Sequence, residues 1–157
     1  MSGCGSCDGG CCSRFFVPLT DADLRRLVGR GFGWGEVVDF LPVGSVGCGF
    51  PDVRVGSGYG YVVLRRGVDG RCCLGEDVGG RLRCRAHGGH PLLCRLFPYR
   101  LDGSVVEGKC GDSGSLEAGV VESGLAELEA YGMLADAWNR RGRVGRGVGD
   151  FMAYLGL

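Results

Sequence analysis

The chain has 157 residues and no net formal charge, with 18 basic and 18 acidic side chains. This length accommodates one domain with a sizeable core and excludes two full-sized ones, so we expect a single domain over residues 1–157. The balanced charge excludes a general attraction to nucleic acid or to anionic membranes. A domain of this size does not need ten cysteines to hold its core together, so the cysteines require another explanation.

The expected environment of the protein is the reducing cytoplasm. No apolar stretch approaches the roughly 20 residues of a membrane-spanning helix, so we expect no membrane partner. No basic and then apolar signal sequence precedes the first cysteine. In the cytoplasm, clustered cysteines bind metals or react with oxidants more often than they form structural disulfides.

The first third of the chain predicts a loop followed by two helices. Residues 1–13 are small, polar and rich in cysteine, and we expect them to pack only if their thiols bind something. Thr20 reads as a helix N-cap with acids in the first turn, and this helix is expected to end at Gly29. A second short helix is predicted over 35–41, ended by Pro42.

The middle of the chain predicts short strands. Residues 53–55 and 59–64 flank Gly56-Ser57-Gly58, which is typical of a hairpin. Asp69-Gly70 and Asp102-Gly103 predict two further turns.

The last third predicts helices. Apolar residues recur at three- and four-residue steps from residue 115 to about 142, although glycines at 119, 124 and 132 are expected to weaken or break this helix. A last short helix is expected over 150–155. Together these elements predict an α+β fold, a small irregular cysteine-rich domain with short hairpins and C-terminal helices.

Four cysteines open the chain in the pattern C-x2-C-x3-C-C, formed by Cys4, Cys7, Cys11 and Cys12. Two cysteines separated by two residues can place both sulfurs on one metal ion. Adjacent cysteines have Cα atoms only about 3.8 Å apart and diverging side chains, which disfavours two ligands on one tetrahedral ion. Cys11 and Cys12 are therefore expected to serve two neighbouring metals or two parts of one polynuclear site.

A second group of cysteines lies between residues 72 and 110. Of the adjacent pair, we favour Cys72 over Cys73 as a ligand, and Cys48 is left unassigned. A donor set made of thiolates favours zinc or an iron–sulfur cluster such as 4Fe-4S, and disfavours calcium and magnesium. The predicted metal ligands, enough for two four-cysteine sites, are Cys4, Cys7, Cys11, Cys12, Cys72, Cys84, Cys94 and Cys110.

Five arginines and no carboxylate occur between residues 81 and 100. Arginines around a thiolate site would offset its negative charge and donate hydrogen bonds to sulfur. The alternative is that they lie on a solvated strand face. We further expect residues 1–13 to fold back against 72–110, with the C-terminal helices packed over them.

The spaced motifs resemble those of the CxxCxxxCC (YkgJ-like) family of zinc- or iron-chelating domains. The opening cysteines are followed by Leu19-Thr20 and Asp23, as in that family. The later family signature, roughly C-x-I-Y-x-x-R-P-x-x-C-R-x-F-P, is matched at Cys84, Pro91, Cys94, Arg95, Phe97 and Pro98. His87 stands where the family has tyrosine and His90 where it has arginine, which leaves mixed Cys/His coordination open. The resemblance implies a metal-binding protein.

The same family includes flagellin lysine N-methylases, which implies an alternative: a cluster-dependent enzyme that uses S-adenosylmethionine to modify a protein substrate. The residues themselves give this alternative little support, because the glycine-rich stretches never complete a G-x-G-x-x-G motif. Catalytic residues and oligomeric state are not predicted.

The sequence disfavours two other functions. Thiol redox chemistry at Cys4-x2-Cys7 lacks the preceding strand that a thioredoxin-like motif needs. The arginines at 140, 141, 143 and 146 suit a solvated helix end better than a nucleic-acid site, given the neutral total charge.

Overall fold

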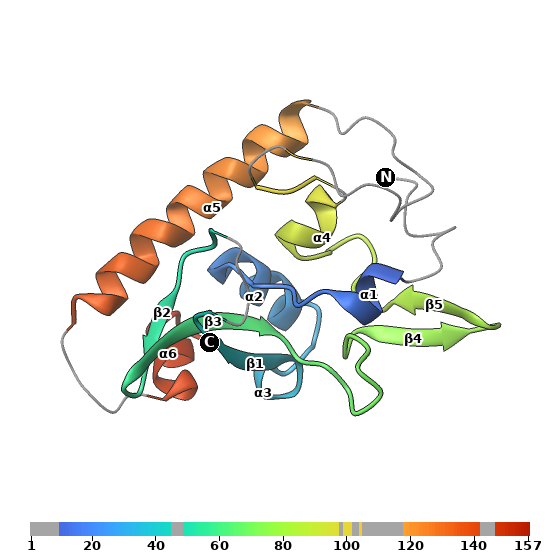
Figure 1. The fold of residues 1–157 in the computed structure, drawn as a ribbon, viewed down its shortest axis with the longest axis horizontal. Coiled ribbons are helices and arrows are strands. Elements are labelled where there is room, and N and C mark those ends of the chain that lie inside the picture. Colours follow the sequence, from blue (N-terminus) through green and yellow to red (C-terminus); the bar gives the residue numbers. More distant parts are fainter. Residues whose placement is uncertain (1–9, 45–48, 98, 102–103, 105–117, 142–146) are drawn as a thin grey trace.

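The computed structural model describes residues 10–44, 49–97, 99–101, 104, 118–141 and 147–157. Within these residues it has an α+β fold, as predicted, with two small antiparallel sheets and a long helix near the C-terminus (Figure 1). The helices are α1 (Gly10–Arg14), α2 (Asp21–Gly29), α3 (Trp34–Val37), α4 (Leu92–Leu96), α5 (Ala118–Asn139) and α6 (Val148–Tyr154). The strands are β1 (Val38–Pro42), β2 (Val53–Val55), β3 (Gly58–Leu64), β4 (Gly75–Val78) and β5 (Arg81–Cys84).

The larger sheet has the strand order β1-β3-β2, with both neighbours antiparallel to β3. The predicted hairpin is confirmed: β2 and β3 are joined at Gly56, whose φ of +63° suits a residue without a side chain. Along β3, residues 60–64 are all buried, so this strand forms the centre of the core. The predicted turn at 102–103 lies outside the described residues.

The smaller sheet is the β4–β5 hairpin, which the sequence analysis did not predict. Its strands are joined by Gly79 and Gly80, which both have positive φ. Two such residues between paired strands are the signature of a tight hairpin turn. The Gly-Gly pair was therefore the available signal.

The predicted helix over 35–41 is wrong beyond its first turn. Helix α3 ends at Val37, and residues 38–42 form β1, which pairs with β3 from Val38 opposite Leu64 to Pro42 opposite Gly60. Strand pairing with residues 18 to 26 positions later overrides the local pattern here, because it satisfies the backbone groups and buries Val38.

Helix α2 begins as predicted. The side chain of Thr20 accepts a hydrogen bond from the amide of Asp23, and the Asp23 carboxylate accepts one from the amide of Thr20, each at 3.0 Å. This reciprocal capping box satisfies two amides that have no partner within the helix.

Helix α5 is continuous over 22 residues, so the predicted glycine breaks do not occur. Its C-terminal end covers the edge of β2, where Trp138 Nε1 donates to the carbonyl of Arg54 at 2.8 Å and Asn139 Oδ1 accepts from the Arg54 amide at 2.7 Å. The ring of Trp138 also contacts Phe151 of α6 at 5.2 Å between centroids. The predicted last helix is thus confirmed as α6 and packs on the same core. No helix in the described ranges is long and apolar enough to cross a membrane.

Close packing between α4 and α5 explains why α5 has a glycine at position 124. Gly124 is buried, and a Cβ built there would lie 2.9 Å from Leu92 Cδ1 and 3.2 Å from Leu96 Cδ2, so its missing side chain lets α4 approach α5 closely. We expect Gly124→Leu to lower the free energy of unfolding by about 1–3 kcal/mol through overpacking. Gly132→Ala in the same helix meets only Pro51, at 3.6 Å, and should raise stability by about 0.5–1 kcal/mol. Urea unfolding of both variants tests this, and equal effects would contradict it.

Candidate metal centre

The structure describes the side chains of four of the eight predicted ligands, on four separate segments. Cys12 lies in α1, Cys72 follows β3, Cys84 ends β5 and Cys94 lies in α4. All four are partly buried. Cys4, Cys7 and Cys110 lie outside the described residues, as does the side chain of Cys11.

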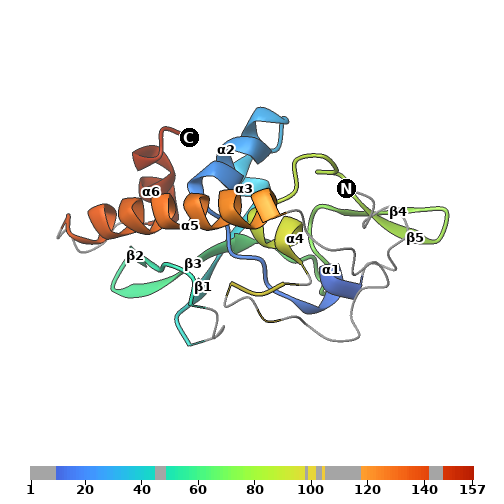
Figure 2. The ribbon, with the colours of Figure 1, turned by 90° about the horizontal axis from the view of Figure 1, so that it is seen from above.

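The N-terminal cysteine segment contacts the later cysteine group directly. The carbonyl oxygen of Cys12 accepts a hydrogen bond of 2.8 Å from the amide of Cys72. Three residues after Cys12, the ring of Phe15 lies 5.9 Å from that of Phe97, which follows Cys94 by three residues. Both views show α1 close to the base of the β4–β5 hairpin and to α4 (Figures 1 and 2). The predicted folding back of residues 1–13 is confirmed at Cys12, and residues 1–9 lie outside the described ranges.

Backbone pairing also holds Cys84 close to Cys72. Gly75, three residues after Cys72, is the strand partner of Cys84, and the amide of Arg85 donates to the carbonyl of Leu74 at 2.8 Å. Backbone hydrogen bonds therefore link the segments that carry Cys12, Cys72 and Cys84. Cys12 and Cys72 are 60 residues apart in the chain, and Cys72 and Cys84 are 12 residues apart.

Among the described side chains, no three of His, Cys, Asp or Glu are arranged to hold a metal ion. A complete ligand set would therefore include cysteines beyond the described ranges. Cys12, Cys72 and Cys84, whose backbones lie close together, carry thiols, and thiols are donors that suit a soft metal.

The adjacent cysteines 72 and 73 differ in their surroundings. The amide of Cys73 donates to the carbonyl oxygen of Arg65 at 2.9 Å. The Cys73 sulfur lies 3.7 Å from the carbonyl oxygen of Val37, the residue just before β1. The amide of Cys72 instead faces α1. This difference favours Cys72 over Cys73 as the residue of the pair that takes part in a site with Cys12.

The thiol of Cys72 has a lowered pKa of about 7. The largest cause is a hydrogen bond from the Cys73 thiol, which outweighs burial, and the amides of Leu74 and Gly75 and the charge of Arg66 act in the same direction. The pKa of Cys73 is raised, because its proton is held between the two sulfurs and its thiol is partly buried. When Cys72 is ionised, its charge attracts this proton more strongly than the neutral carbonyl of Val37 does.

In metal-free protein, we expect iodoacetamide to alkylate Cys72 half-maximally near pH 7 and Cys73 far more slowly. Cys73→Ala removes the hydrogen-bond donor, so the pKa of Cys72 should rise and its alkylation at pH 7 should slow about fivefold to tenfold. Cys73→Ser keeps a donor and should have a smaller effect. Mass spectrometry of the alkylated peptide measures each rate, and identical rates in wild type and Cys73→Ala would contradict the prediction.

The two histidines lie against each other, with ring centroids 5.2 Å apart. Burial, followed by the positive neighbours His87, Arg30 and Arg95, lowers the pKa of His90, which favours the neutral ring at pH 7. Its Nε2 is buried without a hydrogen-bond partner in the described structure. A neutral ring nitrogen is a competent metal ligand, but the cationic neighbours disfavour a metal ion, so mixed Cys/His coordination stays an open alternative.

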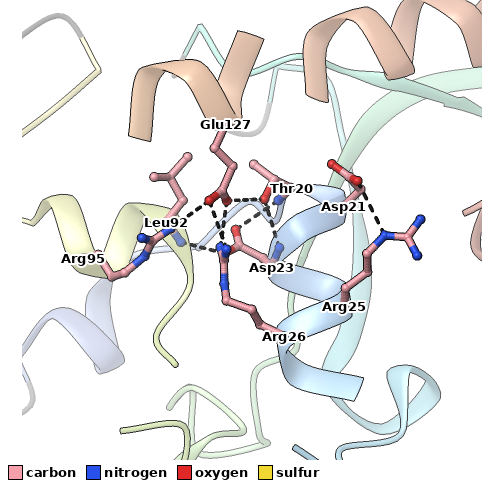
Figure 3. Close-up of polar contacts among 8 residues, drawn as sticks. All are labelled: Thr20, Asp21, Asp23, Arg25, Arg26, Leu92, Arg95 and Glu127. Carbon is pink, nitrogen blue, oxygen red and sulfur yellow. Dashed lines mark hydrogen bonds and ion pairs between the residues drawn. The ribbon is translucent and has the colours of Figure 1, made fainter. Parts of the chain in front are cut away.

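Two of the arginines between residues 81 and 100 make described side-chain hydrogen bonds, both to oxygen atoms, and their predicted role around a thiolate site stays a prediction. Arg95 donates to Glu127 at 2.9 Å, and Arg85 donates to the carbonyl oxygen of Cys73 at 2.9 Å. The carboxylate that was missing from residues 81–100 is supplied by α5 instead (Figure 3). Counting charges along the sequence missed a partner that only the fold brings near.

Glu127 lies at the centre of a polar cluster that the sequence analysis also missed. Its Oε1 accepts from the Thr20 hydroxyl at 2.6 Å and from Arg26 at 2.7 Å, and its Oε2 accepts from Arg26 at 3.0 Å. Burial alone would raise the pKa of Glu127, but the hydrogen bonds from Arg26 and Thr20 and the nearby arginine charges hold it below its ordinary value. No local pattern marks this residue, because its partner Arg26 is 101 residues away.

Comparisons with family models, with curated proteins and with solved structures found no match to this chain. The resemblance to CxxCxxxCC domains therefore depends on the sequence motifs alone and stays a prediction.

Proposed function

We propose that the chain is a metal-binding protein of the CxxCxxxCC type, which holds an iron–sulfur cluster or zinc through cysteine thiolates. The observation that carries this proposal is the hydrogen bond between the Cys12 carbonyl and the Cys72 amide, which joins the opening cysteine motif to the later group. Segments with little apolar content bury too little surface to be held together by packing, and a metal shared by their thiols would stabilise their contact.

The environment of the Cys72 sulfur also supports the proposal. Backbone amides two and three residues later in the chain favour its thiolate form. Hydrogen bonds of this kind to a metal-bound sulfur stabilise its negative charge and tune the site. The metal would neutralise thiolate charge and crosslink the segments, while the protein side chains position the sulfurs.

The test is the metal content and absorbance of protein purified without oxygen. A brown sample with stoichiometric iron and sulfide and broad absorbance near 400 nm indicates an iron–sulfur cluster. A colourless sample with stoichiometric zinc indicates a zinc site. Protein that retains neither metal, and that takes up neither after reduction and reconstitution, would contradict the proposal.

A matched pair of variants tests the assignment to residues. Cys72→Ser is expected to lose at least half of the bound metal, whereas Cys73→Ser is expected to retain it, because the Cys73 sulfur lies by Val37. Equal metal contents in the two variants would contradict the choice of Cys72. Calorimetry of the loaded protein with S-adenosylmethionine addresses the methylase alternative, which requires detectable binding.

A further inference from the structure

Helix α4, which carries Cys94, is too short to be stable by itself. It has five residues, and no side chain caps its N-terminus locally at Pro91. Isolated helices need about 12–15 residues before they become even marginally stable in water. Contacts with other elements must therefore determine where the Cys94 thiol lies.

Two polar anchors hold α4, one on each side of Cys94. The amide of Leu92 donates to Asp23 Oδ1 of α2 at 2.8 Å. Arg95, the residue after Cys94, donates to Glu127 Oε2 of α5 at 2.9 Å. Since Gly124 also lets α4 approach α5 closely, the helix is fixed in position along its length.

Glu127 connects these anchors. Its carboxylate accepts hydrogen bonds from Thr20, Arg26 and Arg95, so one side chain on α5 holds both α2 and α4 (Figure 3). Arg26 pairs in turn with Asp23, which holds the start of α4. The side chain of Glu127 is only 15% exposed, which limits competition from water.

We infer that Glu127 is a positioning residue for the metal centre, acting through Arg95 to fix the place of the Cys94 thiolate; this inference rests on the proposed function. Glu127 has a second effect through the same contact. It neutralises the guanidinium of Arg95, and without it α4 would carry an uncompensated positive charge. Loss of Glu127 would therefore change both the position and the charge of the helix that carries Cys94.

The experiment titrates reduced, metal-free protein with Co²⁺ alone and records affinity and the visible spectrum. Glu127→Gln is expected to bind Co²⁺ about 10- to 100-fold more weakly, with altered band positions, as is typical when groups that orient metal ligands are removed. Glu129→Gln is the matched control, because Glu129 lies on the same helix and is exposed. Circular dichroism at the titration temperature must show that both variants are folded.

Arg95→Gln provides a second route if Glu127→Gln fails to fold. It removes the link to α4 and leaves the contacts of Glu127 with Thr20 and Arg26 in place, so the same loss of affinity is expected. A lower melting temperature with wild-type Co²⁺ affinity and spectrum in both variants would overturn the positioning role alone. Absence of both Co²⁺ binding and iron–sulfur reconstitution in the wild type would instead contradict the proposed function.

Discussion

On the proposed function, removing the metal under reducing conditions is expected to lower the stability of the protein by about 4 kcal/mol, the linkage expected for a ligand present at about 1,000 times its dissociation constant. For a chain of this size, that loss corresponds to a fall in melting temperature of about 8–16 °C. The reason is the unequal distribution of the core. The larger sheet packs with α2, α5 and α6, whereas Phe15 and Phe16, which follow α1, are exposed and the β4–β5 hairpin is largely exposed.

Amide hydrogen exchange identifies which part of the chain loses stability when the metal is removed. After metal removal, the amides of Cys72 and Arg85 should exchange at least about tenfold faster, whereas those of Val62 and Val63 in the sheet should change little. Lowering the pH should have the same effect, because protons compete with the metal for the thiolates and the stabilisation is lost as the pH falls. An unchanged melting temperature after verified metal removal would show that the folding of α1 and of the β4–β5 hairpin does not depend on metal.

Local sequence signals predicted the parts of this fold that local interactions determine. The capping box at Thr20 and Asp23 needs residues only three apart, and the β2–β3 hairpin needs a glycine turn, so both could be inferred from the sequence. The identity of β1 could not, because its pairing with β3 competes with a local pattern that suits a helix. Gly124 was interpreted as a weakness in α5, whereas its cost in propensity is offset by the close approach of α4.

The candidate site shows the same limit. Spacing identified the cysteines, and the contact of Cys12 with Cys72 agrees with the predicted grouping. Spacing could not identify Glu127, since its three partners come from α2, its N-cap and α4. A residue such as Glu127 leaves no motif when its partners are distant in the chain, and its contacts can be seen only once the elements are packed.

Asp23→Ala is expected to destabilise the protein by about 3–5 kcal/mol, the usual cost of removing one partner of a buried ion pair. Its carboxylate is fully buried and has three roles: it accepts from the amide of Thr20, from the amide of Leu92 and from Arg26. Burial raises the pKa of Asp23, although the hydrogen bond from the Thr20 amide and the charge of Arg26 act in the opposite direction. Alanine would leave two amides and one guanidinium without that acceptor.

Asp21→Ala provides the control for this prediction. Asp21 lies two residues earlier in the same helix and pairs with Arg25 at 3.7 Å, with both side chains partly exposed. Such a pair contributes about 0–1 kcal/mol, so this variant should unfold at nearly the wild-type urea concentration. Equal shifts in the two urea midpoints would mean that the buried cluster contributes no more than a surface ion pair. A large shift confined to Asp23→Ala, with faster exchange of the Leu92 amide, would show that this carboxylate anchors α4 as well as capping α2.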